Sequence, residues 1–88
     1  MNIKFELRFE KDIRKVKYKK ILLTLKEKIL ECKAAKDLSE IKQIKKLQGH
    51  DSFYRIRLAD YRIGIEFIND ELIFTIFLHR KNIFKFFS

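Results

Sequence analysis

The segment from Phe53 to Arg80 limits the possible folds more than any other part of the chain. It reads FYRIRLADYRIGIEFINDELIFTIFLHR, with apolar and polar residues largely alternating in three stretches. Ala59-Asp60 and Asn69-Asp70 separate the stretches, and Asp and Asn suit turns because they bond their own backbone and tolerate left-handed conformations. Alternation with a period of two indicates β-strands. The segment therefore predicts a three-stranded antiparallel meander with turns at these two dipeptides.

The two turns fix a register that gathers arginines on one face of the predicted sheet. The expected cross-strand pairs are Arg57 with Arg62, Arg55 with Gly64, Gly64 with Thr75 and Arg62 with Phe77, and His79 follows on the same face. The opposite face is apolar and carries Tyr54, Ile56, Ile63, Ile65, Phe67, Leu72, Phe74, Ile76 and Leu78. Two arginines directly opposite each other destabilise a strand pair. We therefore expect the basic face to be held for an anionic ligand.

Residues 1–88 are expected to form one small domain, because no Pro-, Gly- or Ser-rich linker interrupts the chain. Hydrophobic residues make up 47% of the chain and charged residues 38%, which excludes both a disordered segment and a membrane protein. The N-terminal residues lack the apolar stretch of a signal peptide, so we expect a cytoplasmic protein. Cys32 is the only cysteine, which leaves no Cys/His cluster for zinc. We expect it to fill the core, and we expect no metal or cofactor.

The residues before the meander predict a strand followed by helical structure. Lys4 to Phe9 alternates as a half-buried strand does. From Asp12 to about Ala35 the apolar period becomes helical, and Asp12 is a plausible N-cap. The absence of Gly and Pro leaves open whether this stretch is one helix or a hairpin of two helices broken near Lys17 to Lys20.

Shorter elements complete the predicted α+β domain. A turn of helix is expected at Asp37 to Ile41, an extended piece at Ile44 to Leu47, and a backbone reversal at Gly49. Lys81 to Ser88 is strongly apolar and is expected to fold back on the sheet as a short C-terminal helix. The order of elements predicts helices on one face of the sheet, with the basic face uncovered.

The net charge of +9 points to an anionic partner, such as nucleic acid or an acidic protein. A basic surface on a small protein can also serve solubility alone. Charge by itself does not choose between these two interpretations.

Short motifs in the second half of the chain carry a family resemblance. KKLQGHDSFYRIRLADYRIGIEF and DELIFTIFLHRKNIFKFF contain a Leu-x-Gly piece, Tyr-basic-Ile-basic-Leu, Asp-Tyr-Arg-Ile and a strand ending in His-Arg. They resemble the RelE/ParE toxin superfamily of bacterial toxin–antitoxin modules, on the RelE side. The resemblance implies a RelE-like fold and a type II toxin that acts as a ribosome-dependent mRNA endoribonuclease, or mRNA interferase. It also implies cleavage in the ribosomal A site by 2′-hydroxyl attack without a metal, and inhibition by a cognate acidic antitoxin.

The matched motif positions imply roles for individual residues. Arg55 and Arg57 correspond to basic residues that contact the mRNA backbone and take part in the chemistry. Arg62 corresponds to the arginine that stabilises charge on the scissile phosphate, Arg80 to the residue that helps the leaving oxygen, and His79 to a histidine that acts as acid or base in related toxins. The candidate catalytic set is therefore Arg57, Arg62, His79 and Arg80. The candidate RNA-binding set is Arg55 and Arg57 from the resemblance, together with Tyr61, Phe77, Lys81 and His50, which are chosen for their chemistry and position in the sequence.

Two departures from the family pattern bear on the mechanism. Phe84 stands where many relatives carry a tyrosine, and phenylalanine cannot donate a hydrogen bond. Arg55 and Arg57 stand where relatives carry lysines, and an arginine cannot give up its proton to act as a base. His79 is therefore the residue best suited to proton transfer near neutral pH.

Each candidate residue also has an ordinary structural interpretation. The arginines suit a solvated sheet face balanced by Glu66, His79 suits a strand end, and His50 suits a polar loop tip. Tyr61 and Phe77 are expected to stack on unpaired bases.

Two other functions remain open at this point. One is a ParE-like toxin that binds a protein such as DNA gyrase without cleaving nucleic acid, and the other is an RNA-binding relative with impaired activity, which Phe84 favours. Convergence of the arginines favours the nuclease, because a toxin that only binds protein has no need of it.

Overall fold

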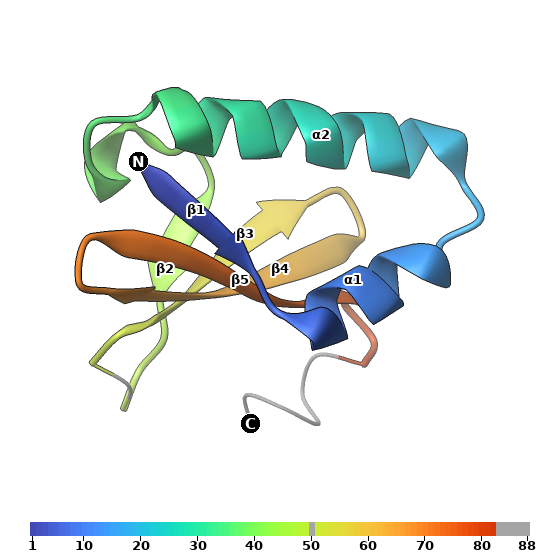
Figure 1. The fold of residues 1–88 in the computed structure, drawn as a ribbon. Helices are drawn as coiled ribbons and strands as arrows, with labels where there is room; N and C mark the ends of the chain where they lie inside the picture. Colours follow the sequence, from blue (N-terminus) through green and yellow to red (C-terminus); the bar gives the residue numbers. More distant parts are fainter. Residues whose placement is uncertain (50, 83–88) are drawn as a thin grey trace.

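A computed structural model of the chain describes residues 1–49 and 51–82, which form a five-stranded sheet with two α-helices on one side of it (Figure 1). The elements in chain order are β1 (Asn2–Phe5), α1 (Leu7–Arg14), α2 (Lys19–Ala34), the 3₁₀ helix η1 (Leu38–Glu40), β2 (Ile44–Lys46), β3 (Phe53–Leu58), β4 (Tyr61–Ile68) and β5 (Glu71–His79). The strand order is β1-β5-β4-β3-β2. Only the β1–β5 pair is parallel, and the described strands β2 to β5 pair antiparallel with their neighbours. The predicted α+β architecture is confirmed.

Both predicted turns of the meander are present. Asn69 and Asp70 have φ values of 53° and 61°, the left-handed pair that a two-residue hairpin of type I′ requires. Ala59 reaches φ 52° in the β3–β4 turn although it lacks the short polar side chain that eases this conformation. The turns therefore hold the register that begins at their tips, including Arg57 opposite Arg62 and Arg55 opposite Gly64.

A bulge in β5 overturns the second half of the predicted register. Ile65 pairs with Phe74 as expected, but Gly64 pairs with Ile76, so Thr75 is the extra residue. The Thr75 hydroxyl donates a hydrogen bond to the carbonyl oxygen of Gly64 over 2.9 Å. The predicted pairs of Gly64 with Thr75 and of Arg62 with Phe77 are therefore wrong.

The bulge also exchanges the faces of β5 beyond Thr75, because a shift of one residue turns each side chain to the other side. Leu78 now lies opposite Arg62, and His79 lies opposite Tyr61. Ile76 and Leu78, predicted for the apolar face, therefore belong to the arginine face. Phe77 and His79 belong to the face that the helices cover.

The N-terminal strand is shorter than the predicted Lys4 to Phe9. It ends at Phe5, and the helix α1 begins at Leu7. Phe9 is fully buried and packs its ring edge-on against Phe74 and Phe77 of β5, with centroid distances of 5.3 and 6.2 Å. This aromatic packing outweighs the alternation that suggested a longer strand.

Asp12 lies inside α1, so its predicted role as an N-cap is wrong. The residue is only 3% exposed, and its Oδ2 accepts a hydrogen bond from the backbone N–H of Phe77 over 3.0 Å. The Arg8 Nε donates to the other carboxylate oxygen over 3.2 Å. Asp12 thus satisfies a backbone donor of β5 beyond Phe74, where β1 no longer pairs with it.

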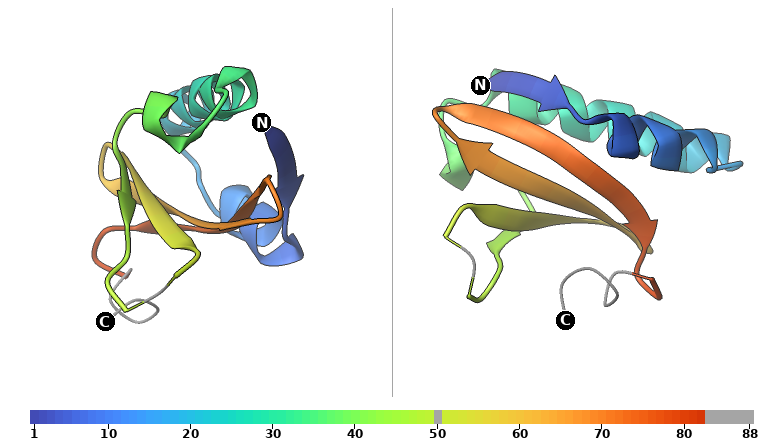
Figure 2. Two further views of the ribbon diagram at one scale, coloured as in Figure 1. Left: turned by 90° about the vertical axis from the view of Figure 1, so that its left-hand side faces the viewer. Right: turned by 60° about the horizontal axis from the view of Figure 1, so that its bottom comes forward.

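The helical stretch is a hairpin of two helices, which decides between the two alternatives left open by the sequence. The break spans Lys15 to Tyr18, close to the suggested position. The helix α2 crosses above the sheet (Figure 2) and buries Leu25 and Cys32. Cys32 is fully buried, and burial together with the charge of Glu31 raises the pKa of its thiol to about 11. The thiol is therefore core filling, as predicted, and not a nucleophile.

The predicted short elements between the helices and the meander are present as η1 and β2. The Asp37 carboxylate accepts a hydrogen bond from the Ser39 N–H at the start of η1, and Gly49 has the left-handed φ of 78°. The predicted C-terminal helix lies outside the described residues beyond Asn82. No described helix is long and apolar enough to cross a membrane.

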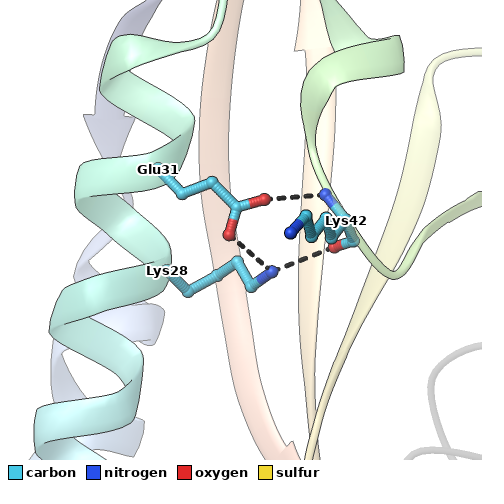
Figure 3. Close-up of polar contacts among 3 residues, drawn as sticks. All are labelled: Lys28, Glu31 and Lys42. Carbon is cyan, nitrogen blue, oxygen red and sulfur yellow. Dashed lines mark hydrogen bonds and ion pairs between the residues drawn. The ribbon is translucent and has the colours of Figure 1, made fainter.

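A polar clip formed by Lys28, Glu31 and Lys42 fastens α2 to the segment that leads into β2 (Figure 3). The Lys28 Nζ lies 2.9 Å from the Glu31 Oε1 and donates to the Lys42 carbonyl oxygen over 3.0 Å. The Lys42 N–H donates to the Glu31 Oε2 over 2.7 Å. Burial disfavours the charged carboxylate, but these donors and the positive charge of Lys28 outweigh it and lower the pKa of Glu31. Each carboxylate oxygen of Glu31 thus receives a hydrogen-bond donor, and its negative charge is paired with the positive charge of Lys28.

Candidate functional site

Basic side chains from three neighbouring strands share the sheet face that the helices leave uncovered. Arg57 of β3 lies opposite Arg62 of β4, and Arg55 lies opposite Gly64, which has no side chain. On its other side Arg55 pairs with Lys45 of β2. Lys45 was not among the residues chosen from the sequence, although the alternation around Ile44 would have placed it on this face.

Arg62 is the buried member of the group. It is 8% exposed, and its Nη1 donates to the carbonyl oxygens of Ala59 and Tyr61 over 2.9 and 2.8 Å. Burial lowers the pKa of its guanidinium, and the positive charges of Arg57, Arg55 and Arg80 lower it further. Asp60 acts in the opposite direction. Arginine nevertheless keeps its charge in a protein, so Arg62 is a fixed cation held among cations.

The other three arginines near Arg62 differ in their exposure and in their polar partners. Arg57 is exposed, whereas the buried Nε of Arg55 has no hydrogen-bond partner among the described residues. Arg80 follows β5, where its N–H donates to the Asp60 carbonyl oxygen over 2.7 Å and its Nε lies 3.8 Å from the Asp60 carboxylate. We call these four residues, Arg55, Arg57, Arg62 and Arg80, the arginine cluster.

The arginine face is less open than the sequence predicted. Arg62, Gly64 and Ile76 are all buried on it. Figure 2 shows the sheet strongly twisted, so this side is not a flat solvated surface. An anion that reached Arg62 would lie in a partly desolvated position, where charge–charge attraction is stronger than in water.

His79 does not lie on the same face as Arg62, contrary to the prediction. Its ring stands edge-on to that of Tyr61, with a centroid distance of 5.4 Å. Its Nδ1 accepts a hydrogen bond from the Lys81 N–H over 3.2 Å, which leaves the Nε2 as the proton-bearing nitrogen of the neutral ring. His79 is therefore oriented by the turn that follows β5.

Tyr61 and Phe77 stack on each other, with centroids 4.8 Å apart and an angle of 13° between the rings. Phe77 is 2% exposed and belongs to the core, so a base cannot reach it in this structure. Tyr61 is half-buried. Of the remaining predicted RNA-binding residues, Lys81 is exposed and His50 lies outside the described part of the chain.

A cavity of about 270 Å³ lies between α1 and the ends of β4 and β5. We call it the α1 cavity, and its lining residues are Arg8, Asp12, Lys15, Val16, Tyr61, Phe77, Leu78, His79 and Asn82. A larger hollow of about 1010 Å³ lies beside Met1, Leu38 and Asp70, away from the arginine cluster. The larger hollow is not the better candidate for a functional site, because the smaller α1 cavity is lined by the candidate histidine, His79.

The arrangement can hold and neutralise a phosphodiester. Guanidinium groups offer paired donors that match phosphate oxygens, and preorganised cations stabilise charge that develops during a reaction. Within the described residues, no group of three or more His, Cys, Asp and Glu side chains is placed to hold a metal ion.

Comparison with known proteins places the chain among toxins. It is 41% identical to Toxin RelE3 of Methanocaldococcus jannaschii, over 99% of both chains. The solved RelB-RelE antitoxin-toxin complex from Methanococcus jannaschii contains a chain with 40% identity and a TM-score of 0.83, with coverage of 97% of this chain and 99% of that one. The Escherichia coli RelBE complex matches with 22% identity and a TM-score of 0.70, covering 89% and 94% of the two chains, and supports the fold alone. No family model matches the sequence.

Proposed function

The chain belongs to the RelE family of toxins, and from that premise we propose that it cleaves mRNA on the ribosome as the toxin of a type II toxin–antitoxin module. The observation that carries the proposal is the arginine cluster, in which Arg62 is buried among the charges of Arg55, Arg57 and Arg80. Such repulsion lowers the stability of the free protein. A bound phosphodiester would relieve it.

In the proposed reaction the ribose 2′-oxygen forms a bond to phosphorus while the bond from phosphorus to the 5′-oxygen of the next nucleotide breaks. The products are a 2′,3′-cyclic phosphate and a 5′-hydroxyl. The arginine cluster stabilises the charge that builds on the phosphate oxygens, with Arg62 in the centre. No metal is required, because the two remaining tasks are to align the strand and to move two protons.

Proton transfer is assigned to His79, the only histidine among the described residues. Arginines cannot serve as bases, and histidine changes its charge near neutral pH. Since His79 faces the helices and Arg62 faces away from them, the RNA must pass over the end of β5 to meet both. Arg80, which follows His79 directly, lies at that end.

The proposal also includes a partner and a location. The relative of known structure is found in an antitoxin–toxin complex, and we propose that this chain likewise binds a cognate antitoxin, whose acidic segment would meet the basic surface. Action on ribosomes places the protein in the cytoplasm. The relatives compared above are RelE toxins, so the gyrase-binding alternative is not favoured.

The test adds the purified chain to translating ribosomes and maps the new 5′ ends of the mRNA. We expect cuts in the A-site codon that disappear when the scissile ribonucleotide carries a 2′-deoxy sugar. The His79→Gln variant should cut more slowly, because glutamine cannot transfer a proton as an acid or base. Intact mRNA in the presence of folded wild-type chain would refute the proposed function.

A further inference from the structure

The α1 cavity lies on the side of the sheet away from the arginine cluster. We propose that the α1 cavity binds one nucleoside of the RNA strand, adjacent to the phosphate held by the arginine cluster. This inference rests on the proposed function, and it adds a second binding site for the same substrate on the helix side of the sheet.

The size of the cavity suits a single nucleoside. Its volume of about 270 Å³ is just below the range of roughly 300–1,000 Å³ that accommodates drug-sized ligands. A folded RNA helix or a peptide segment would not fit. Proteins that read single-stranded RNA commonly place splayed-out bases in sites of this kind.

The lining of the cavity offers contacts for a base. Tyr61 presents a half-buried ring whose position is fixed by its stacking on Phe77. His79 and Asn82 add polar groups that can meet the edge of a base, and the Asn82 N–H donates to the His79 carbonyl oxygen over 2.8 Å, which fixes the turn.

The charge of the cavity suits the phosphate that accompanies a nucleoside. Lys15 is exposed at the end of α1, and the side chain of Arg8 is 46% exposed. The Asp12 carboxylate, which would repel a phosphate, is engaged by the Phe77 N–H and by the Arg8 Nε. Because Arg8 is paired with Asp12, the cavity retains a positive balance through Lys15.

The two sites are neighbours across the end of β5. Leu78 lines the α1 cavity and is the direct partner of Arg62 in the sheet. Arg80 lies just beyond, where it contacts Asp60 of the β3–β4 turn. A strand whose phosphate meets the arginine cluster can thus place its next nucleoside in the cavity, which is the path required if His79 is to reach the RNA.

The test is a titration of the isotopically labelled chain with a short single-stranded RNA whose 2′-oxygens are methylated, so that it cannot be cleaved. We expect shifts in the amide resonances of Lys15, Val16, Tyr61 and Asn82 as well as on the arginine face. Lys15→Glu should weaken binding about three- to tenfold at low salt, because a phosphate contact is lost and a repulsion is added. Lys11→Glu is the matched control on the same helix and should change binding less than about twofold.

The inference is overturned if the amides around the cavity do not respond, whether the RNA binds elsewhere or not at all. Equal effects of Lys15→Glu and Lys11→Glu would also overturn it, since they would indicate only general attraction to a basic helix. The ribosome reaction is scored separately. Cleavage without cavity shifts rejects the cavity alone, whereas intact mRNA on ribosomes rejects the proposed function.

Discussion

The clip of Lys28, Glu31 and Lys42 and the arginine cluster both gather charged groups, and they differ in how those charges are matched. In the clip each carboxylate oxygen of Glu31 receives a donor at 2.7 to 2.9 Å, and the pKa of Glu31 is lowered (Figure 3). In the arginine cluster three like charges act on the buried Arg62, and the buried Nε of Arg55 lacks a partner among the described residues.

The difference indicates what each region is for. A matched set of charges contributes to the stability of the free protein, whereas an unmatched set lowers it and is retained when a ligand supplies the missing charge. Removing charge from the clip should therefore lower stability and spare activity. Removing charge from the arginine cluster should do the reverse.

The largest effect is expected for Arg62→Ala. Loss of a preorganised donor to a developing charge lowers a rate by about 100- to 1,000-fold, so mRNA cleavage on ribosomes should fall by that order. Arg62→Lys keeps the charge but not the planar pair of donors, and should recover only part of the rate. Arg14→Ala, which removes an exposed arginine of α1, is the control.

If soluble, folded Arg62→Ala cleaves mRNA at the wild-type rate, the arginine cluster does not stabilise the charge that develops on the phosphate. Folding has to be verified by a thermal melt, because Arg62 also donates to the carbonyl oxygens of Ala59 and Tyr61.

A smaller effect, on stability, is expected for Glu31→Gln. The amide retains an acceptor for the Lys42 N–H but loses the ion pair with Lys28, which should cost about 1 kcal/mol of unfolding free energy for this partly exposed pair. Denaturant melts at neutral pH measure the loss. Glu27→Gln lies one turn earlier on α2, is exposed, and should change stability by less than about 0.5 kcal/mol.

The same variant carries a pH signature. Because the folded pKa of Glu31 is lowered from its ordinary value of 4.5, its contribution is complete above that value and is lost as the pH falls through the folded pKa. The stability gap between wild type and Glu31→Gln should therefore shrink under acid conditions. A gap that stays constant down to acid unfolding would mean that the clip does not stabilise through charge.

The smallest effect is expected for Arg57→Thr, which removes one member of the confirmed Arg57–Arg62 pair. Relief of the cross-strand repulsion should raise the unfolding free energy by about 0.5 kcal/mol while activity falls. Parallel melts and cleavage reactions of this single variant measure both quantities. A less stable Arg57→Thr would show that the pair is not repulsive in the free protein, and the cluster would then resemble the clip.

The strand pairs of the site were predicted correctly close to a turn and wrongly farther from it. Near the Ala59-Asp60 turn, Arg57 opposite Arg62 and Arg55 opposite Gly64 were predicted correctly, because turn residues fix a register locally. Past Thr75 the same reasoning placed His79 beside Arg62, and the bulge moved it to the helix side. Nothing in the alternation of residues 71–79 signals the extra residue, since Thr75 fits a regular strand equally well.

The molecule as a whole divides in the same way, between features that local sequence determined and features that only the tertiary structure decided. The sequence by itself determined that a strand and helices precede the meander, that Cys32 is core, and that the basic residues at 55, 57 and 62 share a face, because periodicity and turn chemistry act over a few residues. Only the tertiary structure decided that Asp12 satisfies the Phe77 N–H across 65 positions of sequence, that Glu31 clips α2 to Lys42, and that Tyr61 and His79 line the α1 cavity. Those outcomes depend on which backbone donors remain unpaired once β1 ends and on which rings meet in the core, and both are properties of the packed molecule.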